Sequence, residues 1–135
     1  MKTKRMRTWA SAALLLAGAV PLAAHHSFAA EYDSSKPVTL QGTVKKLEWT
    51  NPHARFYIEV KDPNGAMVNW ELELGSPNTL IRYGWTRFSM KVGDDVTVEG
   101  YLAKDGANMA NAKTVKFTDG RVINAGSTAD LAPTK

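Results

Sequence analysis

Three histidines carry the clearest chemistry in this sequence. His25 and His26 follow a run of small residues near the N-terminus, and His53 lies further along the chain. If the chain is cut after Ala24, the new α-amino group and the imidazole of His25 can chelate one metal ion together. A second imidazole, from His26 or His53, would complete a nitrogen-rich set like the histidine brace of exported copper proteins. Nitrogen ligands in open tetragonal geometry suit Cu(II), so the sequence predicts a metal site with copper as the preferred ion.

The segment before these histidines predicts export. Residues 1–24 contain a basic start, an apolar run from Trp9 to Val20 and small residues ahead of Ala24, which are the three parts of a secretory signal peptide. The apolar run is shorter than the roughly 20 residues needed to span a bilayer. We therefore expect a periplasmic protein, or one secreted further, with no stable membrane insertion after processing.

The exact cleavage point decides the geometry of the predicted metal site. A cut after Ala23 would make His26 the third residue, where the amine, two backbone nitrogens and the imidazole can enclose Cu(II) or Ni(II). A cut after Ala29 would remove both histidines; the residues before it also fit a cleavage site, but they lie far from the apolar run.

Each histidine also has a simpler interpretation. His25 and His26 fit a solvated N-terminal arm equally well. His53 follows Asn51-Pro52, a pair typical of turns, so it can merely begin a strand with its ring bonded to the backbone. The chain between His25 and His53 is long enough to let them meet.

A second hypothesis needs no metal. Trp49, Arg55 and Tyr57 fall around the first two predicted strands, where they could bind a protein partner or a small ligand. No catalytic set is found: there is no G-x-S-x-G nucleophile elbow. Glu71 and Glu73 alternate on one strand face and are interpreted as a solvated charge ladder opposite Arg55. Both hypotheses therefore describe a binding module rather than an enzyme.

The charge balance argues against nucleic acid as a partner. The whole chain has a formal charge of +4, but its four cations at positions 2, 4, 5 and 7 leave with the signal peptide. The remaining 13 basic residues balance 13 acidic ones. The mature chain therefore has no surplus of cations with which to displace counterions from a nucleic acid. The chain also has no cysteine, so thiolate ligands and disulfides are excluded.

The elements that must position these residues are mostly strands. Period-two alternation predicts five strands, with a bulge near Lys45-Lys46, and one short helix capped by Ser76 between the third and fourth strands. This order predicts a mainly β, five-stranded OB-fold-like barrel. The expected organisation is a signal peptide (1–24), an N-terminal arm (25–37), a β domain (38–124) and a disordered tail (125–135).

Four motifs together resemble a known family. They are Ala24-His25-His26-Ser27-Phe28, Asn51-Pro52-His53, Trp70-Glu71-Leu72-Glu73, and the pattern S-P-N-x-L-x-R-x-G-W from Ser76 to Trp85. The chain resembles a family of exported proteobacterial proteins classed only as a domain of unknown function. The resemblance implies a periplasmic, OB-fold-like domain and brings no activity with it.

Overall fold

A computed structural model describes residues 28–129, and this part of the chain is mainly β. One helical turn over residues 28–31 precedes the first strand. The other elements are, in order, β1 (Tyr32–Glu48), β2 (Arg55–Lys61), β3 (Met67–Glu73), α2 (Pro77–Arg82), β4 (Asp95–Ala103), β5 (Met109–Phe117) and β6 (Val122–Asn124).

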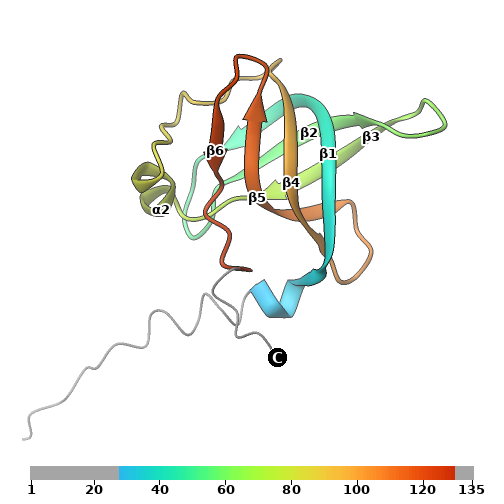
Figure 1. Cartoon of the computed structure of the whole chain (residues 1–135), viewed down its shortest axis with the longest axis horizontal. Coiled ribbons are helices and arrows are strands. Elements are labelled where there is room, and N and C mark those ends of the chain that lie inside the picture. Colours follow the sequence, from blue (N-terminus) through green and yellow to red (C-terminus); the bar gives the residue numbers. More distant parts are fainter. Residues whose placement is uncertain (1–27, 130–135) are drawn as a thin grey trace, which may run out of the picture.

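The strands form a ring (Figure 1). Their order in the sheet is β3-β2-β1-β4-β5-β6 with antiparallel neighbours, and a parallel pairing of β3 with β5 closes the circle. The mainly β class and the helix between β3 and β4 are as predicted. The prediction of five strands was wrong, because the short β6 pairs with the second half of β5 in the described chain. Three residues are too few for period-two alternation to reveal a strand.

The first strand, β1, is long and bent because it pairs with two different strands. Its first part pairs with β4 and its last part with β2, and the register slips between Val44 and Lys46. This slip is the predicted bulge. At Gly42 the strands cross so closely that an added Cβ would lie 2.5 Å from the carbonyl oxygen of Glu59. Only glycine permits this crossing without displacing the backbone.

Local sequence explains the next two elements. Asp62 accepts hydrogen bonds from the backbone N–H of Asn64 and of Ala66, and Gly65 takes the positive φ that this β2–β3 turn requires. In α2, Ser76 accepts from the N–H of Thr79, as expected of the helix cap.

The ring encloses one apolar core. Alternate residues of each strand point inward, and side chains of β2, β3, β4 and β5 in this core are almost fully buried. Trp85, just after α2, is buried against the same core and donates from its indole nitrogen to the carbonyl oxygen of Asn124 at 2.8 Å. The residues that alternate with these inward-facing ones point outward. Part of that outer surface is covered by other segments of the described chain.

The two ends of the described chain supply that cover. Phe28, Tyr32, Ala103 and Ala129 form a second, smaller apolar cluster. In Figure 1 the turn over residues 28–31 and the segment after β6 meet at one end of the ring. Packed structure in the described chain therefore reaches from Phe28 to Ala129. Within residues 28–129, no helix has the length and apolar character needed to cross a membrane.

Candidate functional site

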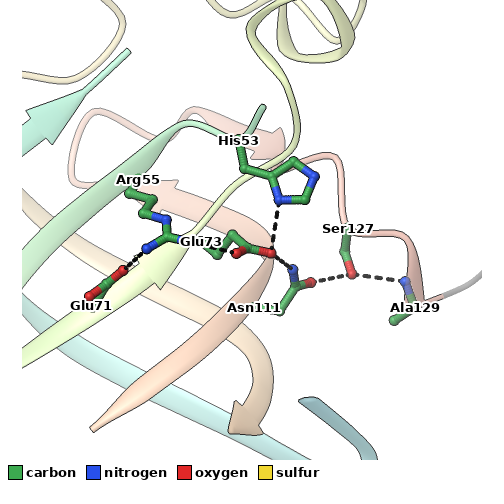
Figure 2. A network of polar contacts seen from close by, with 7 residues as sticks. All are labelled: His53, Arg55, Glu71, Glu73, Asn111, Ser127 and Ala129. Atoms are coloured by element: carbon green, nitrogen blue, oxygen red, sulfur yellow. Dashed lines mark hydrogen bonds and ion pairs between the residues drawn. The ribbon is translucent and has the colours of Figure 1, made fainter. Parts of the chain in front are cut away.

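His53 is held by a buried carboxylate. It lies in the connection between β1 and β2, directly before Ala54, and its Nδ1 is 3.3 Å from Oε1 of Glu73 at the end of β3 (Figure 2). The Glu73 side chain is only 5% exposed, whereas that of His53 is 25% exposed. The imidazole therefore contacts a buried anion and is itself partly exposed to solvent.

Glu73 has two further partners among the described residues. Asn111 on β5 donates from Nδ2 to Oε1 at 3.3 Å, and Arg55 on β2 lies with Nη2 at 3.4 Å from Oε2. Arg55 also reaches Oε1 of Glu71 at 2.6 Å. The pairings Arg55↔Glu73 and Glu73↔Asn111 explain this meeting, because they place the three residues side by side across the closed ring.

The network continues into the segment after β6. Ser127 donates from Oγ to Oδ1 of Asn111 at 2.6 Å and accepts from the N–H of Ala129 at 3.1 Å. Figure 2 shows this as one continuous row from His53 through Glu73 and Asn111 to Ala129. The C-terminal segment and the imidazole are thus connected through a single carboxylate.

The positive charge of protonated His53 and the negative charge of Glu73 stabilise each other. The hydrogen bond to Glu73 raises the pKa of His53 above its ordinary value, although partial burial opposes the rise. Burial alone would raise the pKa of Glu73, but the hydrogen bond from His53 and the charges of His53 and Arg55 hold it below its usual value. Glu73 is therefore an anion at neutral pH, in spite of its burial.

This geometry selects one form of the neutral imidazole. Because Glu73 only accepts hydrogen bonds when ionised, Nδ1 of His53 must carry the proton. The lone pair is then on Nε2, which is the nitrogen left to bind a ligand. A carboxylate behind an imidazole is the usual arrangement of a metal-binding histidine, since it fixes the ring and raises its basicity.

A cavity of about 380 Å³ lies against this site. His53, Glu73 and Asn111 contribute to its wall, together with Ser76 and Thr79 of the α2 region, Tyr83, Ser127 and Phe28. Phe28 is 4% exposed and its ring centroid lies 5.7 Å from that of Tyr32 and 5.9 Å from that of Tyr101. The beginning of the described chain is therefore anchored at the cavity of His53.

The other predicted site residues do not all belong to the network around His53. His25 and His26 lie outside the described residues. Trp49 packs partly buried against the main core, whereas Tyr57 donates to Oε2 of Glu48 at 3.2 Å and receives the ammonium group of Lys46 over its ring. Arg55 alone joins the network of His53. Among residues 28–129, no group of three or more His, Cys, Asp or Glu side chains is arranged to hold a metal ion.

Sequence reasoning missed the most important residue of this site. Glu73 was interpreted as part of a solvated ladder, but its side chain is only 5% exposed and lines a cavity together with Phe28 and Ser127, from the two ends of the described chain. A weak signal existed in Asn111, a lone polar residue within the apolar run of Met109 to Ala112. Ser127 gave none, since it stands in a stretch of small and polar residues.

The fold and the site together define a small β-ring protein in which a partly exposed histidine is paired with a buried carboxylate. Residues 12–112 match the family model described as "Family of unknown function (DUF6152)", and the chain belongs to this family. The predicted membership of a family of unknown function is thereby confirmed. The matched range contains His25, His26, His53, Glu73 and Asn111 and ends before Ser127. No match was found among curated protein sequences.

Proposed function

We propose that this protein is an exported, non-catalytic module that binds a metal ion, with copper as the preferred ion, through His25 and His53. In this proposal the signal peptide directs the chain to the periplasm, and the ring of strands is an OB-fold-like barrel with α2 between β3 and β4. The His53–Glu73 pair is the observation that carries the proposal.

The orientation of His53 supports its role as a ligand. Glu73 occupies Nδ1 at 3.3 Å and leaves Nε2 for a metal. A histidine that served only to satisfy a buried carboxylate would have no need of a cavity beside it. The cavity of about 380 Å³ gives an incoming ion and its other ligands room at this nitrogen.

The position of Phe28 supports His25 as the second ligand. Phe28 lines the same cavity as His53. Three residues cover at most about 11 Å when extended, so a mature chain that begins at His25 starts within about that distance of Phe28. The α-amino group and imidazole of residue one are then within reach of Nε2 of His53, and His26 is a further candidate.

Protons compete with the metal at these nitrogens. Because the pKa of His53 is raised by Glu73, the ring is partly protonated near neutral pH and must lose its Nε2 proton before it binds. Affinity is therefore expected to increase as the pH rises through the pKa of His53. Copper is favoured over other divalent ions because it leads the affinity order for nitrogen ligands.

The metal-free alternative has less support. Of its three residues, Trp49 packs against the core and Arg55 is engaged by two glutamates. Tyr57 is partnered by Glu48 and Lys46. A ligand on this surface would have to displace contacts already made within the chain.

Copper titration of the exported, processed protein tests the proposal. Intact mass first establishes that the chain begins at His25. We expect saturable binding of one Cu(II), seen in the visible absorption spectrum, and an increase in melting temperature on binding. His25→Ala and His53→Ala should each weaken binding at least about ten-fold.

Two controls separate this site from incidental copper binding. A protein with one extra glycine before His25 keeps every side chain but moves the amine, so it should lose the high-affinity site. Glu48→Gln removes a carboxylate that does not contact His53 and should leave binding unchanged. Binding that survives both His25→Ala and His53→Ala would refute the proposal, as would a mature chain that begins after Phe28.

A further inference from the structure

Tyr32 carries a buried hydroxyl that lacks a hydrogen-bond partner. Within residues 28–129, it is the one buried side-chain polar atom for which the structure gives no partner. The residue is only 1% exposed, and its ring centroid lies 5.7 Å from that of Phe28. A buried polar group without a partner costs free energy, so this hydroxyl requires an acceptor in its surroundings.

Tyr32 lies at the same junction of strands as Glu73. It belongs to the smaller apolar cluster, and Met109 of β5 packs against that cluster. Met109 pairs with Glu71 across the parallel junction of β3 and β5, and two residues further along Asn111 pairs with Glu73. Residues two apart in a strand point to the same face of a sheet. The cluster of Tyr32 therefore lies on the face that carries Glu73.

The electrostatics also place the hydroxyl of Tyr32 near the carboxylate of Glu73. Burial raises the pKa of Tyr32, and the negative charge of Glu73 raises it further. The hydroxyl is therefore protonated at neutral pH and can act as a donor. Glu31 is the other carboxylate that raises this pKa, but it is exposed and hydrated. The buried anion available to the hydroxyl is therefore Glu73.

Glu73 has a hydrogen-bond position left for such a donor. An ionised carboxylate accepts at about four positions on its two oxygens. His53 and Asn111 contact Oε1, whereas Arg55 contacts Oε2 at 3.4 Å. Among the described residues, Oε2 is thus the oxygen with fewer contacts, and it can accept from Tyr32.

We propose that Tyr32 is a positioning residue for His53: its hydroxyl donates to Oε2 of Glu73 and keeps Oε1 turned towards Nδ1 of the imidazole. Arg55 does not fix the carboxylate alone, because its guanidinium is shared with Glu71 at the shorter distance of 2.6 Å. The hydrogen bond of Tyr32 is a property of the fold. Only its effect on metal affinity rests on the proposed function.

Tyr32→Phe tests the hydrogen bond, because it removes the hydroxyl and keeps the ring. In proton NMR spectra of the mature protein, a buried hydroxyl bound to a carboxylate should give a slowly exchanging downfield signal. The signal should be absent from Tyr32→Phe and displaced in Glu73→Gln, where a neutral amide replaces the anion. The Nδ1 proton of His53 should also shift in Tyr32→Phe, because the carboxylate that accepts it is held less firmly.

A double-mutant cycle measures how strongly the two groups are coupled. Tyr32→Phe should raise the equilibrium constant of unfolding at least about ten-fold in the wild type, but only about three-fold in the Glu73→Gln variant. The difference is expected because hydrogen bonds to charged acceptors are stronger than those to neutral ones. Equal effects in the two backgrounds would overturn the proposal, since the hydroxyl would then act independently of the carboxylate.

Tyr101→Phe is the matched control. Its ring packs against the same apolar cluster, with its centroid 5.9 Å from that of Phe28, but the residue is partly exposed. Removal of this hydroxyl should leave the downfield signal and the Nδ1 proton of His53 in place. A shift of the Nδ1 proton in Tyr101→Phe equal to that in Tyr32→Phe would overturn the proposal.

Copper affinity measures the consequence for the proposed metal site. Tyr32→Phe should weaken binding of Cu(II) about three- to ten-fold, because Glu73 is less well fixed behind the imidazole of His53, and Tyr101→Phe should not change it. Unchanged copper affinity in Tyr32→Phe would overturn the positioning role. A wild-type protein that binds no copper would refute the proposed function instead, and the NMR and unfolding measurements would still decide the role of Tyr32.

Discussion

At the scale of single residues, the site depends on Glu73. Its carboxylate is 5% exposed, yet it stays ionised because His53, Arg55 and Asn111 surround it with donors. A buried charge is tolerated only when it is paired and hydrogen-bonded in this way. Removing the charge should therefore change both the pKa of His53 and the stability of the fold.

Glu73→Gln is expected to lower the pKa of His53, because its main hydrogen bond to an anion is lost. NMR titration of the imidazole protons measures this directly. Glu71→Gln is the matched control, since Glu71 lies two residues away on the same strand and contacts Arg55 but not His53. An unchanged pKa in Glu73→Gln would show that the pair does not form in solution.

The His53–Glu73 pair should make the stability of the wild type depend on pH, and Glu73→Gln should remove this dependence. His53 has a raised pKa, so its contribution is complete below pH 6.5 and is lost as the pH rises through the raised value. Glu73 has a lowered pKa, so its contribution is present above pH 4.5 and is lost as the pH falls through the lowered value. The free energy of unfolding of the wild type should exceed that of Glu73→Gln by about 1–3 kcal/mol between pH 4.5 and 6.5. The difference should shrink as the pH rises through the raised pKa of His53 and as it falls through the lowered pKa of Glu73. Urea denaturation at several pH values measures this difference.

At the scale of elements, most of the fold could be predicted from local patterns. Alternation located five strands and the bulge near Lys45-Lys46, and Ser76 began the helix where expected. β6 could not be found in this way, because its three residues are ordered by pairing with β5 rather than by their own pattern. The burial of Glu73 was equally invisible, since segments distant in sequence line the cavity beside it.

Gly42→Ala tests the bend in β1. The added methyl group would lie 2.5 Å from the carbonyl oxygen of Glu59, so the two strands must separate. We expect a loss of about 1–3 kcal/mol in the free energy of unfolding, measured by urea denaturation. Gln41→Ala, at the exposed neighbouring position, should change it by less than about 0.5 kcal/mol. A neutral Gly42→Ala variant would contradict this account of the strand crossing.

At the scale of the whole molecule, the ends of the described chain complete the structure. The turn over residues 28–31 and the segment after β6 meet at one end of the ring, and Phe28 and Ser127 from these segments line the cavity of His53. Composition alone does not reveal that these two segments, which are distant in the sequence, pack into one apolar cluster. His25 and His26 lie just before this packed region, and their part in the site stays a prediction.

Phe28→Ala should therefore act on the entire fold. Phe28 is 4% exposed between two tyrosine rings, so its truncation is expected to lower the free energy of unfolding by about 3 kcal/mol. Phe88→Ala removes the same group from a side chain that is 75% exposed and should cost less than about 0.5 kcal/mol. Equal costs would mean that the N-terminal turn does not pack as described. Chemical denaturation of both variants provides the comparison.

The parallel pairing of β3 with β5 joins only three residue pairs, and one of them is Glu73 with Asn111. His53 and Glu73 are already neighbours across the hairpin of β2 and β3, whereas Asn111 reaches the carboxylate only across this parallel pairing. The side-chain amide of Asn111 therefore acquires its partner only in a molecule whose circle of strands is complete. Its NMR signal serves as a built-in indicator of closure, and a molecule with an open circle would keep the histidine pair but lack this contact.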